Sequence, residues 1–173
     1  KGEHMTDEFL KLNPMHTVPT IKLKNGNGMY ESRLILKYLA GMYKNNKNNT
    51  NSLEIDHWLF WDIGFLNTNV GKVIYPRLFM NSEPTSKDID RLVEKLQHLN
   101  KHLENNLFLV NNDFSIADLS SCMLIHNSQI RVDLVNIKNY PHIVKWMKNV
   151  EKQFSNEDWQ EVMNPFFTWV ESL

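Results

Sequence analysis

Several features that would assign the chain to a special class are scarce or missing. Its 173 residues include one cysteine and carry a formal net charge of −1 at pH 7. One cysteine excludes both an internal disulfide framework and the Cys-x-x-Cys pair of a disulfide oxidoreductase, and it suits a reducing cytosol. The near-zero net charge gives no electrostatic case for a nucleic acid or an anionic membrane as a partner. The longest apolar runs are far below the about 20 residues of a membrane span, and no signal-peptide pattern precedes the first motif.

Metal-binding patterns are equally scarce. The seven histidines are scattered and have no cysteine partners at zinc spacing. His98 and His102 are four residues apart on a predicted helix, but a solvated polar face explains them better than a metal site does. We therefore expect no metal, and we expect Cys122 to be a small core residue.

The most informative stretch runs from residue 13 to residue 33, NPMHTVPTIKLKNGNGMYESR. Val18-Pro19 directly precedes a short apolar run, and a prolyl bond held cis there would turn the backbone sharply. Such a turn leaves neighbouring main-chain groups free to pair with an extended ligand. A Gly/Asn turn then separates two predicted strands, 20–24 and 28–30, which would form a hairpin.

Charged and hydroxyl side chains open the amphipathic helix predicted for residues 32–43. The free N–H groups of a helix start, together with the Ser32 hydroxyl and the Arg33 guanidinium, suit a carboxylate. Glu31 supplies the opposite charge, which suits an ammonium group. An α-amino acid head group carries both charges on one carbon, and this stretch therefore predicts a site for such a head group.

These motifs together resemble the glutathione-binding half of the cytosolic glutathione transferases. The similarity is greatest to the insect delta and epsilon classes, in which NP-x-HT-[IV]-P and ESR stand at nearly this spacing, and it runs to about residue 150. Upstream Gly2-Glu3-His4 fits the same pattern. Two positions depart from the family pattern: Met15 replaces a frequent Gln, and the turn at residues 25–28 has one extra residue.

The resemblance assigns glutathione contacts to particular residues. It implies that the Val18-Pro19 bend pairs its main chain with the cysteinyl part, that Glu31 meets the γ-glutamyl ammonium, and that Ser32 and Arg33 meet its carboxylate. His16, and more weakly His4, would meet the glycyl carboxylate. The alternatives are a surface ion pair for Glu31 and Arg33, a turn histidine for His16, and a residue near a frayed end for His4.

The resemblance also sets the expected fold. It implies an incomplete thioredoxin-like domain at residues 1–43, a polar Asn-rich linker at 44–52, and an all-α glutathione-transferase domain at 53–173. In the family a β-α-β segment with the catalytic serine precedes these residues. No residue of this chain matches that serine, so we expect no catalytic residue here and no normal activity of the chain by itself.

Helical patterns fill the second predicted domain. The run 53–80 predicts one long helix, broken or bent near Pro76. Ser86 or Thr85 is expected to cap a helix at 87–104. Ser115 and Asp118 form a capping box for a buried helix at 116–129. Further helices are expected at 141–153, with proline at its first position, and in an aromatic tail that folds back over the domain.

The electrophile site should be apolar. Tyr75 and Phe79 on the long helix are its candidates, followed by Phe166 or Phe167, although the pattern favours a core position for each of them. We expect an enzyme that conjugates glutathione to small apolar electrophiles in xenobiotic detoxification. It would be cytoplasmic and a homodimer when complete. The alternative is a non-catalytic glutathione-transferase-like binding or assembly module.

Overall fold

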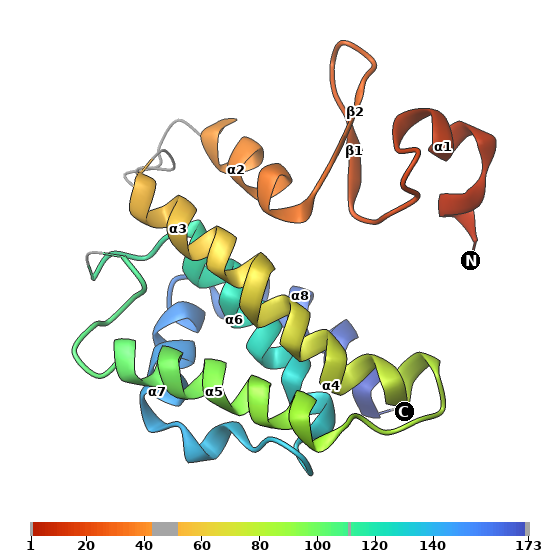
Figure 1. Ribbon diagram of the computed structural model, residues 1–173. Coiled ribbons are helices and arrows are strands. Elements are labelled where there is room, and N and C mark those ends of the chain that lie inside the picture. Colours follow the sequence, from red (N-terminus) through yellow and green to blue (C-terminus); the bar gives the residue numbers. More distant parts are fainter. Residues whose placement is uncertain (1, 43–51, 111, 172–173) are drawn as a thin grey trace. The chain divides into compact units, whose positions relative to one another are not determined.

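The computed structural model describes residues 2–42, 52–110 and 112–171, which divide into two compact units on either side of residue 50 (Figure 1). Most of the expected linker, residues 44–51, lies outside the described residues, as does Tyr43. Among the described helices, none is long and apolar enough to cross a membrane.

The first unit holds two short helices, a hairpin and a longer helix. A 3-10 turn at Glu3–Met5 leads into α1 (Asp7–Leu12), and Thr6 caps α1 by accepting the Phe9 N–H. Strands β1 (Thr20–Lys22) and β2 (Gly28–Tyr30) pair antiparallel, and α2 (Ser32–Met42) follows directly. The predicted hairpin and helix are therefore present, with β1 ending two residues earlier than expected.

Glycine is required in β2 and in the hairpin turn. A Cβ on Gly28 would lie inside the Leu12 carbonyl, because the end of α1 packs directly against this strand. Gly26 has a φ of 88°, which glycine adopts at little cost. The hairpin is thus supported by α1 as well as by α2, as a two-stranded sheet must be.

The second unit is entirely helical within its described part. Its elements are α3 (Leu53–Trp61), a π-helical segment (Asp62–Asn67), α4 (Thr68–Phe79), α5 (Ser86–His102), α6 (Ile116–Ser128), two 3-10 turns (Gln129–Arg131 and Ile137–Asn139), α7 (Pro141–Glu151) and α8 (Asn156–Glu171). Helix α6 packs against α3, α4 and α7 (Figure 1). It is the buried helix that the capping box predicted.

The long helix differs from the expectation of a break near Pro76. It continues through Pro76 to Phe79, and its departure from α geometry lies earlier, at Asp62–Asn67. In that segment Asp62 is fully buried and accepts a hydrogen bond of 2.5 Å from the Ser120 hydroxyl of α6. A buried carboxylate needs such a partner, and the partner is distant in sequence. Neighbouring residues in the sequence therefore do not predict where the π-helical segment lies.

The Asp118 carboxylate connects α6 to its surroundings. It accepts hydrogen bonds from the main-chain N–H groups of Leu109 and Ser115 at 2.8 and 2.9 Å, from the Ser115 hydroxyl at 2.9 Å and from the Trp146 indole at 2.8 Å. Burial raises the pKa of Asp118, and the four donors act against that rise. The capping box is confirmed, and it also anchors α7 and the segment before α6.

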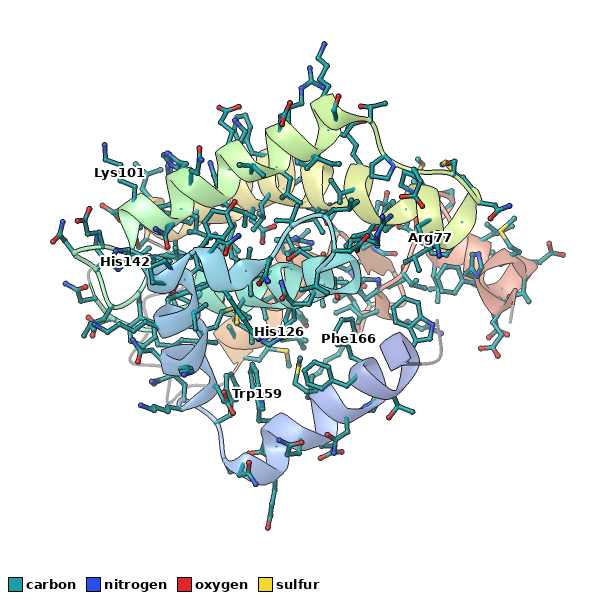
Figure 2. The ribbon with its side chains drawn as sticks, turned by 90° about the horizontal axis from the view of Figure 1, so that it is seen from below. Arg77, Lys101, His126, His142, Trp159 and Phe166 are labelled. Atoms are coloured by element: carbon teal, nitrogen blue, oxygen red, sulfur yellow. The ribbon has the colours of Figure 1, made fainter. Side chains whose placement is uncertain are left out.

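Helix α8 folds over α6, as expected for the aromatic tail. Trp159 and Met163 are buried, and the His126 ring of α6 lies 5.8 Å from the Trp159 ring and 6.1 Å from the Phe167 ring (Figure 2). Burial lowers the pKa of His126 to about 4. The imidazole is therefore neutral at pH 7 and packs as part of an aromatic cluster. Cys122 is also buried, as expected.

Replacing Asp118 tests whether one carboxylate holds this unit together. Asp118→Ala leaves buried donors without an acceptor, and it should lower the free energy of unfolding by about 3 kcal/mol or more. The exposed Asp113→Ala should change it by less than about 0.5 kcal/mol. Urea titration monitored by circular dichroism measures both. Equal, small losses in the two variants would show that the Asp118 bonds are dispensable.

Candidate functional site

The candidate site begins with a loop that a buried amide holds in place. Asn13 is fully buried, and its amide nitrogen donates to the Thr17 carbonyl at 3.0 Å and to the Thr17 and Thr20 hydroxyls at 2.9 Å each. Its side-chain oxygen accepts the Met15 N–H at 2.9 Å. One side chain thus fixes both ends of the loop that leads into β1.

The Val18-Pro19 bond in this loop is cis, as the sequence analysis expected. Val18 is 72% exposed, and its main-chain N–H and C=O make no hydrogen bond to other described residues. Exposed main-chain N–H and C=O groups without a partner can pair with an extended chain. The loop therefore offers main-chain pairing to a peptide-like ligand.

The hairpin register brings this loop and the start of α2 to the same end. Thr20 pairs with Tyr30 and Lys22 with Gly28, so the next pair in the same register is Pro19 and Glu31. Residues that face each other across antiparallel strands lie about 5 Å apart at their Cα atoms. The prolyl bend and the Glu31-Ser32-Arg33 motif therefore lie at the same end of the hairpin, with Pro19 and Glu31 twelve positions apart in sequence.

The backbone at the start of α2 has an uncommon conformation. Glu31 has a φ of 75°, an uncommon conformation for a residue other than glycine that often marks a functional position. The Arg33 guanidinium donates to the Ser32 hydroxyl oxygen at 2.8 Å. Because that oxygen already accepts a hydrogen bond, the Ser32 hydroxyl can turn its own proton toward a ligand carboxylate.

The two candidate histidines lie close to each other. The rings of His4 and His16 are 6.4 Å apart between centroids, although the residues are twelve positions apart in sequence. His16 has a φ of 45° and donates its N–H to the Asn13 carbonyl at 3.0 Å. It is therefore a turn residue whose ring remains available, and the Asn13 loop positions it.

The candidates for the electrophile site lie on two helices of the second unit. Tyr75 and Phe79 are four residues apart on α4, and their ring centroids are 5.6 Å apart. Tyr75 is 50% exposed and Phe79 is 72% exposed. Phe166 and Phe167 are neighbours on α8, and Phe167 is 42% exposed (Figure 2). Tyr75 and Phe79 are therefore surface side chains of this unit, whereas the sequence favoured a core position for each.

Sequence reasoning missed Asn13 as a structural residue of the site. It was noted only as the first letter of a motif, and nothing local shows that its amide reaches Thr20 seven residues later. The available signal was composition, since an asparagine before proline followed by two threonines favours side-chain hydrogen bonds to a turn.

Comparison with known proteins agrees with this geometry. Residues 1–42 match the family model of the glutathione S-transferase N-terminal domain, and residues 69–153 match that of the C-terminal domain. The chain belongs to the glutathione S-transferase family, whose members use glutathione as co-substrate.

Insect glutathione transferases are among the similar proteins. The chain is 28% identical to glutathione S-transferase D6 of Drosophila melanogaster over 87% of its own length and 71% of the relative's. A solved Bombyx mori glutathione transferase, BmGSTD1, is 30% identical with a TM-score of 0.79, and the match covers 88% of this chain and 71% of that one. Isozyme E7 of Drosophila melanogaster is 27% identical with a TM-score of 0.80, covering 98% and 80%.

Removing the Asn13 amide should loosen the candidate site without unfolding the hairpin. In Asn13→Ala the loop loses three donated bonds and the acceptor of the Met15 N–H, so the main-chain N–H groups of Met15 and His16 should exchange with solvent faster, by about tenfold or more. Hydrogen exchange followed by mass spectrometry measures this. Asn27→Ala, in the exposed hairpin turn, is the control. Unchanged exchange in the Asn13 variant would contradict the role given to this amide.

Proposed function

We propose that the segment from Asn13 to Arg33 binds glutathione and that the protein acts as a transferase of its thiolate. The cysteinyl part pairs with the Val18 main chain beside Pro19. Glu31 meets the γ-glutamyl ammonium, while Ser32 and Arg33 meet its carboxylate. The observation that supports this most strongly is the hairpin register, which puts the open backbone of the bend next to the charged start of α2.

The charges at this helix start match the γ-glutamyl end. The positive end of the α2 macrodipole, the Arg33 guanidinium and the Ser32 hydroxyl all favour a carboxylate. Glu31 stands one residue before them and complements the ammonium on the same carbon. At the opposite end of the tripeptide, His16 and His4 hold the glycyl carboxylate.

The chemical step is attack of the thiolate on an apolar electrophile. A free thiol has a pKa near about 8.5, so a group that favours the thiolate speeds the reaction at pH 7, and each pKa unit is worth about 1.4 kcal/mol. We assign that group to no residue of this chain. Tyr75 and Phe79 offer an apolar surface that suits the electrophile.

We also propose that two copies associate and that the protein works in the cytosol. Apolar side chains stay exposed on α2 and along α3 and its π-helical continuation; they are Leu34, Leu39, Met42, Phe60 and Phe65. Exposed apolar surface of this kind is typical of protein–protein contacts, and the lone buried cysteine suits a reducing compartment. Sedimentation velocity at micromolar concentration should show a dimer, and a monomer there would refute the association.

Calorimetric titration tests the glutathione site without relying on turnover. Glu31→Gln and Ser32→Ala should each weaken glutathione binding about tenfold, because each removes a hydrogen bond to a charged group. A glutathione analogue without the γ-glutamyl amino group should bind Glu31→Gln and the unmodified protein equally. Glu8→Gln, an exposed change on α1, should alter neither affinity.

Two results would contradict the proposal. One is equal affinity of glutathione for the unmodified protein and Glu31→Gln. The other is that Glu31→Gln weakens binding of the amino-free analogue as much as it weakens binding of glutathione. That result would show that Glu31 acts on structure alone. Conjugation of a chromogenic electrophile then distinguishes a transferase from a binding module, since a module binds glutathione and gives no product.

A further inference from the structure

A cavity in the helical unit lies among residues that the proposed glutathione site does not use. Its volume is about 750 Å³. It is formed by the first turns of α3, the C-terminal end of α5 and the segment from residue 106 to residue 112. A volume of this size accommodates a small organic molecule.

One carboxylate gives the cavity its charge. Glu54 is the only Asp, Glu, Lys or Arg among the described residues that line it. The Ser52 hydroxyl donates to Glu54 at 2.5 Å, and this bond lowers the pKa of Glu54. The carboxylate therefore stays ionised at neutral pH, fixed at the rim by the residue that caps α3.

The C-terminal end of α5 also places a partial negative charge at the cavity. The C-terminal end of a helix carries a partial negative charge, and α5 ends at His102, which lines the cavity. The Asn106 amide, also in the lining, donates to the His102 carbonyl at 2.7 Å and fixes this end. Lys101 points outward from the domain (Figure 2). The partial negative charge at the end of α5 offsets the positive partial charge at the start of α3, so the Glu54 carboxylate leaves the cavity with a net negative charge that favours a cation.

The rest of the lining is aromatic and aliphatic. The rings of Trp58 and His102 are 4.5 Å apart, and Leu109 and Val110 complete the apolar wall. The His102 ring nitrogen Nε2 lies 3.1 Å from the Leu109 carbonyl, to which it donates, and burial lowers the pKa of His102. The imidazole thus stays uncharged and does not repel a cation.

We propose that this cavity binds a protonated aromatic amine, with the ammonium at Glu54 and the ring against Trp58, His102 and Leu109. The site is separate from the proposed glutathione site, because the described residues that line it all belong to the helical unit. It would give the protein a second class of small ligand besides glutathione and the electrophile.

Three indole compounds of nearly equal shape test the charge requirement. Tryptamine carries an ammonium, tryptophol a neutral hydroxyl and indole-3-propionate a carboxylate. In calorimetric titrations of the full chain at pH 8, tryptamine should bind about fivefold more tightly than tryptophol, the gain expected for a partly exposed ion pair. Indole-3-propionate should bind more weakly than either. Equal binding of the three, or no binding of tryptamine, would overturn the proposal.

Two variants test whether Glu54 causes the preference for tryptamine. Glu54→Gln should reduce tryptamine binding to the level of tryptophol and leave tryptophol unchanged, whereas Glu161→Gln, an exposed change on α8, should alter neither. In ¹H–¹⁵N spectra, tryptamine should shift the signals of His57, Trp58 and Leu109. A full tryptamine response in Glu54→Gln, or shifts confined to other residues, would show that the amine binds elsewhere.

Discussion

The pairing register of β1 and β2 is the constraint on which the proposed glutathione site depends. With Thr20 opposite Tyr30, the cis Val18-Pro19 bend and the Glu31-Ser32-Arg33 helix start occupy the same end of the hairpin. A slip of one residue would turn every strand side chain to the other face. Gly28 resists such a slip, because any larger residue in its place would collide with the Leu12 carbonyl.

Buried polar side chains stabilise both units by hydrogen bonding to main-chain and side-chain groups of other segments, up to 28 residues away. Asn13 does so for the loop before β1, and Asp118 does so for the segment before α6 and for α7. Each is fully buried with its hydrogen bonds made, and this is the condition under which a buried polar group stabilises a fold. Both therefore act as connectors rather than as ligand-binding groups.

The sequence predicted the features that local chemistry determines. The caps at Thr85 and Ser115, proline at the first position of α7 and the hairpin with its cis bond all follow from residues within a few positions of one another. It did not predict the π-helical turn at Asp62, the reach of Asn13 or the packing of His126 against Trp159. Each of these depends on a partner that folding alone brings near. For the candidate site, the motif predicted Glu31, Ser32 and Arg33, and the structure adds that the Arg33 guanidinium donates to the Ser32 hydroxyl oxygen.

The proposed glutathione site implies one orientation of the tripeptide, with its γ-glutamyl end at α2 and its glycyl end at His16. A crystal structure of the chain with glutathione tests this most directly. The account predicts the γ-glutamyl carboxylate about 2.7–3.0 Å from the Ser32 hydroxyl and the cysteinyl amide paired with the Val18 main chain. Glutathione bound in the reverse direction, or away from the prolyl bend, would contradict it.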